Sequence, residues 1–210
     1  MSSKKIVVAL TGASGSIYAV RLVESLLMLE HEVHLTASTT AVTVFALEQK
    51  LNKNEQKPGK NVEFPAMFRS ILGRQKEHAK ITFHAVDDFS AKIASGSFPT
   101  DGMVVVPCSS GSLGAIASGV NRHLIHRAAE VHLKERRKLI LVFRETPYSL
   151  VHIENMGIVT RAGAVVLPAS PPFYHQPETI YELVDAVVVR ILDQLGLEHP
   201  METGRWKDSQ

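Results

Sequence analysis

Small and hydroxyl-bearing residues form two short segments, each directly after a run of apolar residues. Thr11-Gly12-Ala13-Ser14-Gly15-Ser16 follows Ile6–Leu10, and Cys108-Ser109-Ser110-Gly111-Ser112 follows Met103–Pro107. Small residues let the backbone approach an anion, and the amides at the start of a following helix point at it. Both segments predict a phosphate-binding turn, with Ser14 adding a hydroxyl group. The alternative for the first segment is a tight turn with a purely structural role.

A third polar segment, Thr36-Ala37-Ser38-Thr39-Thr40, follows another apolar run. A dinucleotide site would place an acidic residue here for the ribose and would carry Gly-x-Gly-x-x-Gly in the first turn, and neither is present. The hydroxyls suit a phosphate or a ribityl chain, so the segment favours a mononucleotide such as FMN over NAD. Ser38 equally fits a helix N-cap without a ligand.

Charged and phenolic residues follow two later apolar runs. Arg144 and Glu145 come after Leu139–Phe143, and Tyr174 lies in a proline-rich loop after Ala164–Pro168. An ion pair ahead of a helix starting at Thr146 or Ser149 is the alternative for the first pair. Spacing alone places Arg190 on a solvated helix flank, and the basic run Lys134–Lys138 at a helix end, where cations complement the helix dipole.

Composition limits the ligand classes. The net charge of +2 is too small to drive nucleic-acid or bilayer binding, and no apolar run approaches the roughly 18 residues of a membrane span. The ten histidines form no metal-binding spacing, and Asp87-Asp88 has no third acid suited to magnesium, so no metal is expected. Cys108 is the only cysteine and is interpreted as a small core residue. With no apolar signal region after Met1, this predicts a cytoplasmic protein.

Apolar runs alternate with helical patterns along the chain. Strands that are apolar on both faces, separated by amphipathic helices, predict an α/β fold. The expected architecture is Rossmann-like (flavodoxin-like), a three-layer, doubly wound parallel sheet of about six strands, with ligands beyond the carboxyl ends of the strands. Residues 1–210 are expected to form one FMN-binding domain with an insertion at about 51–80 and a short tail beyond His199.

Seven segments in this order closely resemble the UbiX-like flavin prenyltransferases, from about Lys5 to Trp206. They are Thr11–Gly15, Ala94–Phe98, Pro107–Ser109, Arg127–Val131, Leu133–Arg137, Arg144–Pro147 and Phe173–Pro177. Phe143 departs from the pattern, since a smaller residue is common there. The resemblance implies transfer of a dimethylallyl group from dimethylallyl monophosphate to N5 and C6 of reduced FMN. The product, prenylated FMN, would serve a UbiD-like decarboxylase in aromatic-acid decarboxylation or ubiquinone synthesis.

The resemblance also implies a role for each matching residue. FMN would be held by Gly12, Ala13, Ser14, Ser38, Ser109, Ser110, Gly111, Ser112 and Arg144. Lys134, Tyr174 and Arg190 would bind the substrate phosphate across subunit contacts in a dodecamer. Without a metal, such cations must stabilise the departing phosphate. Glu145, assisted by Glu48 and Ser14, is the candidate acid/base for the proton lost at C6.

Two other functions are also compatible with the sequence. One is an FMN-dependent decarboxylase of peptidyl cysteines, although no Pro-Ala-Ser-Ala-Asn-Thr-like segment is present. The other is a non-catalytic FMN carrier, in which Glu145 would be dispensable.

Overall fold

A six-stranded, all-parallel sheet forms the centre of the protein. The computed structural model describes residues 3–49, 63–72 and 80–200. The strands are β1 (Lys5–Leu10), β2 (Glu32–Ala37), β3 (Ile81–His84), β4 (Gly102–Cys108), β5 (Lys138–Phe143) and β6 (Val165–Pro168). Their spatial order is β3-β2-β1-β4-β5-β6, the doubly wound order of the Rossmann class. The predicted fold class is confirmed.

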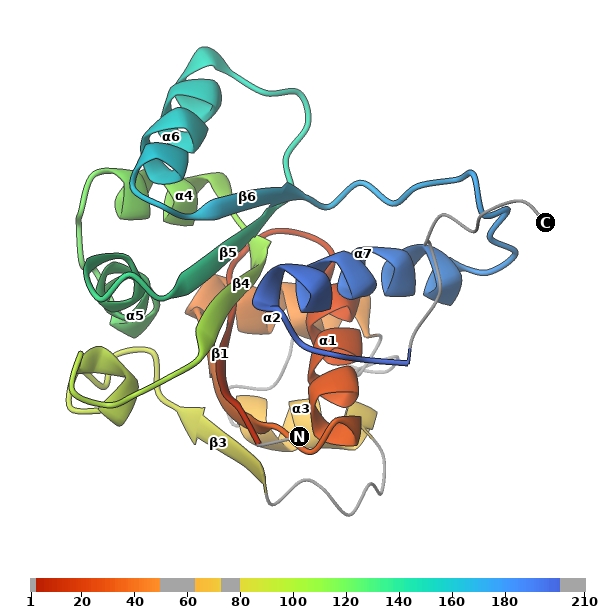
Figure 1. Cartoon of the computed structure of the whole chain (residues 1–210), viewed down its shortest axis with the longest axis horizontal. Coiled ribbons are helices and arrows are strands. Elements are labelled where there is room, and N and C mark those ends of the chain that lie inside the picture. Colours follow the sequence, from red (N-terminus) through yellow and green to blue (C-terminus); the bar gives the residue numbers. More distant parts are fainter. Residues whose placement is uncertain (1–2, 50–62, 73–79, 201–210) are drawn as a thin grey trace.

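Helices cover both faces of this sheet (Figure 1). One layer contains α1 (Ser16–Met28), α2 (Thr39–Glu48), α3 (Phe64–Leu72) and α7 (Ile180–Leu195). The other contains α4 (Ser110–Ala117), α5 (Leu124–Lys134), α6 (Leu150–Arg161) and the short 3-10 helix η2 (Lys92–Ala94). Alternate residues of β1 enter separate cores: Ile6, Val8 and Leu10 pack with α1 and α7, whereas Val7 and Ala9 pack with α5. Each buried aliphatic side chain contributes about 1.5–3 kcal/mol to folding.

Helix boundaries differ from the sequence prediction mainly at the amino ends. The apolar spacing predicts a helix from Pro177 to Leu195, but α7 begins at Ile180, because the Thr179 side chain accepts a hydrogen bond from the Glu182 amide and caps the helix. The sequence also predicts that the helix ending in the basic run Lys134–Lys138 begins near Asn121, whereas α5 begins at Leu124. Of the predicted insertion at 51–80, the structure describes α3 and its neighbours; Asn52–Lys60 lies outside the described residues.

Two arginines of the α5 region fasten the loop that follows η2. Arg137 donates hydrogen bonds to the carbonyls of Gly96 (2.6 Å) and Phe98 (2.8 Å), and Arg127 donates to the carbonyl of Ala94 (3.0 Å). The basic run was interpreted as a complement to the helix dipole. For Arg137 the structure shows direct bonds to another loop instead, so the Ala94–Phe98 and Leu133–Arg137 segments are in contact.

Replacing Arg137 with Lys should destabilise the protein by about 1–2 kcal/mol, because one ammonium group cannot reproduce the spread of a guanidinium over two carbonyls. The matched control is Arg136→Lys, at an exposed neighbouring position. Urea unfolding followed by circular dichroism measures both. Equal midpoints for the two variants would show that the loop does not depend on Arg137.

Candidate functional site

The carboxyl ends of β1 and β4 meet at the point where the sheet order reverses. Chain segments after β1 continue to β2 and β3, and those after β4 continue to β5 and β6 on the other side. In open α/β sheets, ligands bind in the crevice created at this point. The Thr11 hydroxyl joins the two ends: it donates to the carbonyl of Pro107 (2.8 Å) and accepts from the amide of Ser109 (2.7 Å). Thr11 was predicted only as part of the turn, and its bridging role needed the strand order.

Both glycines of the first small-residue turn, Gly12 and Gly15, are required by its structure. A Cβ atom on Gly12 would lie 2.6 Å from Cγ2 of Thr40 in α2, so the turn packs directly on that helix. Gly15 has φ of 110°, in the left-handed region that favours glycine. Ala13 is buried, whereas Ser14 is exposed. Only Ser14 of this turn therefore presents its side chain to solvent.

The carboxylate of Glu48 occupies the amino end of α1. It accepts hydrogen bonds from the amides of Gly15 (2.9 Å) and Ser16 (2.8 Å), and also from the Ser14 side chain. The sequence placed an external anion at this turn, but two of its amides already bind this internal one. Glu48 and Ser14, predicted to assist catalysis, are thus brought together.

Protonation of Glu48 is disfavoured in the folded protein. Burial by itself would raise the pKa of the carboxyl, but hydrogen bonds from the Ser14 and Ser16 side chains and from the Gly15 and Ser16 amides lower the pKa below its ordinary value. At neutral pH Glu48 is an anion that holds the Ser14 hydroxyl in a fixed orientation. Glu48 is therefore suited to positioning Ser14.

The second turn leaves room for a ligand. The Ser109 side chain caps α4 by accepting from the Ser112 amide (3.3 Å), and Ser112 itself is buried. A Cβ on Gly111 would meet nothing within 4 Å, in contrast to Gly12. Ser110 and Gly111 thus border open space at the start of a helix. Cys108 is fully buried, and burial raises the pKa of its thiol to about 12, so it is an inert core residue.

Ser38 caps α2 and stays close to the first turn. Its side chain accepts from the Ala41 amide (3.1 Å), and its own amide donates to the carbonyl of Leu10 (3.0 Å). The N-cap alternative is therefore correct for the side chain. Thr39 and Thr40 beside it are exposed.

Arg144 and Glu145 lie at the end of β5 beside a hollow of about 400 Å³. Phe143, Arg144, Glu145, Thr146, Tyr148, Ala169 and Ser170 line this hollow. Arg144 reaches back across β4 and donates from Nε to the carbonyl of Ser14 (3.2 Å). Glu145 accepts from the Thr146 amide (3.1 Å) rather than pairing with Arg144. The structure thus joins the ends of β1, β4 and β5 into one continuous edge.

The three predicted phosphate ligands lie in different places. Arg190 on α7 borders a second hollow that shares Ser170 with the first, and its side chain is 59% exposed. Tyr174 is exposed and lies in the segment between β6 and α7. Lys134 is paired with Glu135 at the carboxyl end of α5, next to the start of β5. Within one chain, Lys134 is therefore at the opposite end of the sheet from Glu145.

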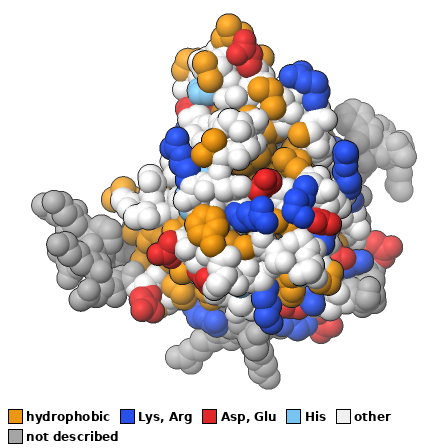
Figure 2. Space-filling view, turned by 90° about the vertical axis from the view of Figure 1, so that its left-hand side faces the viewer, with side chains coloured by type: hydrophobic (Ala, Val, Ile, Leu, Met, Phe, Trp, Pro, Cys, Tyr) orange, Lys and Arg blue, Asp and Glu red, His pale blue; other side chains and the backbone are white. Residues whose placement is uncertain are grey.

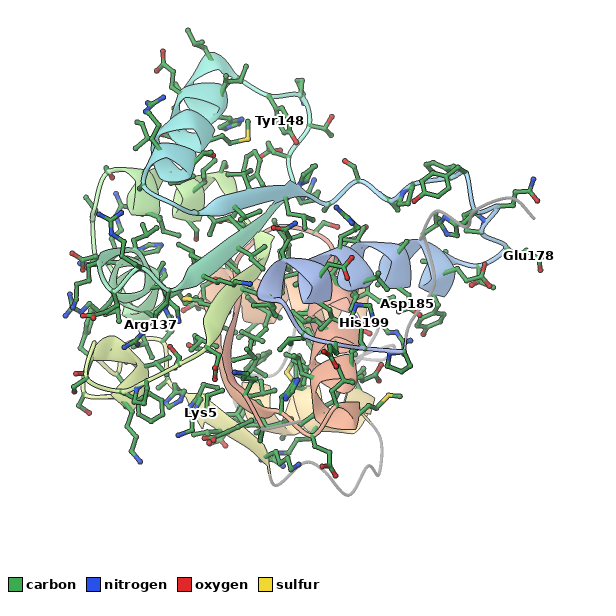
Figure 3. All side chains as sticks on the ribbon, viewed as in Figure 1. Lys5, Arg137, Tyr148, Glu178, Asp185 and His199 are labelled. Atoms are coloured by element: carbon green, nitrogen blue, oxygen red, sulfur yellow. The ribbon has the colours of Figure 1, made fainter. Side chains whose placement is uncertain are left out.

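Figure 3 shows this separation: Arg137, close to Lys134 in the chain, lies at the foot of β5, and Tyr148 lies beyond its other end. β5 has six residues, roughly 20 Å at ~3.3 Å per residue. A lysine side chain does not span that distance. If Lys134 serves a site with Glu145, it does so for another copy of the chain.

The edge fits a flavin mononucleotide. β2 and β5 are three strand positions apart, about 14 Å at ~4.8 Å per step, so a long ligand can extend from Ser38 past Ser14 to Arg144. Ser110 and Gly111 offer helix amides and open space along this path. No cluster of three or more potential metal ligands occurs among residues 3–49, 63–72 and 80–200. No helix in the described part of the chain is long and apolar enough to cross a membrane.

This fold and edge define a doubly wound α/β protein of the flavoprotein class, and residues 1–192 match the family described as Flavoprotein. Flavin prenyltransferase UbiX of Pseudomonas aeruginosa is 43% identical over 203 residues, covering 97% of this chain and 94% of its own. That of Aquifex aeolicus is 41% identical, with coverage of 97% and 99%. The chain belongs to the UbiX-like flavin prenyltransferases.

Solved structures agree with this assignment. The crystal structure of AnUbiX (PadA1) in complex with FMN and dimethylallyl pyrophosphate has a TM-score of 0.81 and 39% identity, covering 100% of both chains. A dodecameric FMN-dependent UbiX-like decarboxylase from Escherichia coli O157:H7 has a TM-score of 0.80 and 39% identity, covering 98% of this chain and 100% of that one. The cysteine decarboxylase TvaF, at 14% identity and a TM-score of 0.57, shares the fold alone.

Replacing Gly12 and, separately, Gly111 with Ala should distinguish a glycine that is needed for packing from one that is needed for close approach of the ligand. Gly12→Ala forces Thr40 to move and should destabilise the protein by about 1–3 kcal/mol. Gly111→Ala, with open space around it, should leave stability unchanged or raise it by up to about 1 kcal/mol, but weaken FMN binding. Urea unfolding and a flavin fluorescence titration measure the two effects. Unaltered FMN affinity in Gly111→Ala would mean that the ligand does not approach this glycine.

Stability contributed by Glu48 should depend on pH. Because its folded pKa is lowered, the contribution is complete above the ordinary value of 4.5 and is lost as pH falls through the folded pKa. Glu48→Gln should therefore cost about 1 kcal/mol at neutral pH and progressively less in acid. Urea unfolding across this range tests it, with Glu198→Gln at an exposed position after α7 as control. A pH-independent difference would contradict the ionised cap.

Proposed function

We propose that this protein joins the dimethylallyl group of dimethylallyl monophosphate to N5 and C6 of reduced FMN. The observation that carries the proposal is the continuous edge from Ser38 to Glu145, which adjoins the hollow at the ends of β5 and β6. Family membership supports the reaction, as does the FMN and dimethylallyl pyrophosphate complex of AnUbiX. The proposal differs from the AnUbiX complex in naming dimethylallyl monophosphate, and not the pyrophosphate, as the donor.

Ser38 and Ser110 would hold the phosphate of FMN, and Arg144 would hold its ring system, with the flavin along the edge. Gly12 and Ala13 form the tight turn beneath it, and Ser109 and Ser112 shape the second turn. Bound reduced FMN supplies electron-rich nitrogen and carbon atoms that accept the prenyl group. The protein holds the donor against them, and this orientation provides a large part of the catalysis.

Charge at the far end of the edge serves the departing phosphate. Cleavage of the allylic carbon–oxygen bond leaves its electron pair on the phosphate, so Arg190 and Tyr174, with Lys134 from another copy, stabilise the leaving group. Positive side chains do this without a metal. Ser170 lines both the hollow at Arg190 and the hollow at Glu145, so the donor phosphate and the prenyl group would occupy neighbouring spaces.

Glu145 acts as the acid/base. The five-carbon unit replaces one hydrogen on each of N5 and C6 and gains one hydrogen at its former double bond. One group that accepts and returns a proton satisfies this balance, and the remaining proton leaves with phosphate. Glu145 lines the hollow, and among the described residues its carboxylate is hydrogen-bonded at one oxygen, by the Thr146 amide, whereas Glu48 is occupied at both oxygens.

Several copies of the chain form the working assembly. α6 exposes three large apolar side chains near its amino end, Leu150 (68%), Val151 (62%) and Ile153 (53%), and exposed apolar surface of this kind is suited to protein–protein contact. Figure 2 shows hydrophobic side chains gathered at the top of the molecule, where α6 lies. The segment carrying Tyr174 extends away from the body (Figure 1). A dodecamer, as described for the Escherichia coli protein, would cover these surfaces and bring Lys134 to a neighbouring Glu145.

The product, prenylated FMN, passes to a UbiD-like decarboxylase, and the setting is the cytoplasm, in keeping with a single buried thiol and no intramolecular disulfide. A non-catalytic FMN carrier is the competing function. It predicts the same flavin binding but no role for Glu145.

Anaerobic incubation with reduced FMN and dimethylallyl monophosphate should yield a flavin heavier by one C5H8 unit, measured by mass spectrometry. Glu145→Gln should retain FMN affinity and lose about 100-fold or more in turnover, since it removes an acid/base; Glu198→Gln, at an exposed position after α7, is the control. Unchanged flavin mass with intact FMN binding rules out the transferase, and full turnover in Glu145→Gln assigns the proton transfer to another group.

A further inference from the structure

The hollow beside Glu145 has two chemically different sides. Arg144 and Glu145 form a charged side, while Phe143, Tyr148 and Ala169 form an apolar side. Apolar walls with a few placed polar groups are typical of small-molecule sites. Of the apolar residues, Tyr148 is the one with a large part of its side chain outside the core: it is 44% exposed, against 1% for Phe143.

The Tyr148 ring rests on a fixed base. It stacks on Phe143 with ring centroids 5.5 Å apart and an interplanar angle of 30°. Phe143 is in turn held edge-on by His152 at 5.8 Å and 72°. Because Phe143 is buried in the core, the Tyr148 ring cannot move toward it. The stack therefore limits movement of the Tyr148 ring on its core-facing side.

The backbone on both sides of Tyr148 is also restrained. Before it, the Thr146 amide is bound by the Glu145 carboxylate. After it, Ser149 and His152 exchange two hydrogen bonds of 3.2 and 3.3 Å that cap α6. The loop that carries Tyr148 beyond the end of β5 is visible in Figure 3. Tyr148 is therefore a pre-organised wall, placed three residues from the acid/base.

We infer that Tyr148 sets the length of the prenyl chain that the enzyme accepts. This inference rests on the proposed function. With the flavin along β2 to β5 and the donor phosphate toward Arg190, the hydrocarbon part of the donor occupies the apolar side of the hollow. A five-carbon group ends against the Tyr148 ring, whereas a ten-carbon geranyl group needs the space that the ring fills.

The test compares kcat/KM for dimethylallyl monophosphate and geranyl monophosphate with reduced FMN. Tyr148→Ala should raise the geranyl-to-dimethylallyl ratio at least ~10-fold, because even one methylene in a hydrophobic site changes selectivity by roughly 10–200-fold. Tyr148→Phe, which keeps the ring, should retain the wild-type ratio. Tyr148→Leu provides a smaller truncation if the Ala variant folds poorly.

A binding measurement separates chain-length selection from effects on turnover. With oxidised FMN in place of the reduced acceptor, calorimetry should show tighter geranyl monophosphate binding to Tyr148→Ala than to the wild type. FMN affinity itself should not change. Tyr181→Ala is the matched control, since Tyr181 is also a half-exposed tyrosine (59%) but borders a different hollow near Arg21.

Three results would overturn the inference. One is an unchanged donor ratio in both truncation variants while the wild type prenylates FMN with the five-carbon donor. Another is a loss of FMN affinity in Tyr148→Ala at constant donor ratio, which would place the ring against the flavin. A wild-type protein that prenylates FMN with neither donor would remove the proposed function itself, and is recognised because no ratio can then be measured.

Discussion

The hydroxyl of Thr11 joins the ends of β1 and β4, and every part of the functional edge depends on these two strands ending together. The strands are neighbours in the sheet although about ninety residues separate them, because the chain winds outward from β1 in one direction and from β4 in the other. Four polar strand ends thereby lie in a row, and Arg144 adds a further link to the first turn. A ligand bound along this row would contact groups from residues 11 to 170 in the order of the strands in the sheet, which differs from their order in the sequence.

The two carboxylates along the edge, Glu48 and Glu145, have different surroundings and therefore different roles. Glu48 supplies a fixed negative charge on the amino end of α1, which neutralises a helix terminus that would otherwise attract phosphate. In the proposed function, an anionic ligand would then be directed to the termini of α2 and α4 and toward Arg144 and Arg190. The second carboxylate, Glu145, stays in the hollow with one hydrogen bond, so the two acids of the edge have different chemistry.

The fold and the positions of the turns could be predicted because they depend on local patterns. Apolar runs followed by Gly12 or Gly111 define strand, turn and helix, and parallel strands place those turns at one edge. What could not be predicted is that the Glu48 carboxylate already binds amides of the first turn. Glu48 lies 33 residues from Gly15, and only the packing of α2 on the first turn brings them into contact.

The same limit applies to Arg137 and Tyr148. Arg137 belongs to a basic run whose local interpretation, dipole complementarity, is physically reasonable, yet its partners Gly96 and Phe98 are about forty residues away. Tyr148 shows no periodic or motif signal at all. Its relation to Phe143 depends on the turn after β5, and the unusual size of Phe143 was the only signal in the sequence that pointed there.

Within one chain, Lys134 and Glu145 lie at opposite ends of the sheet. This spatial separation has a consequence for genetics as well as for structure. If each reaction centre draws Lys134 from one copy and Glu145 from another, damage to either residue is confined to the centres that the altered copy supplies. Assemblies mixed from a chain lacking Lys134 and a chain lacking Glu145 would then contain some centres with both groups present. Two inactive alleles of this protein would complement one another inside a single particle.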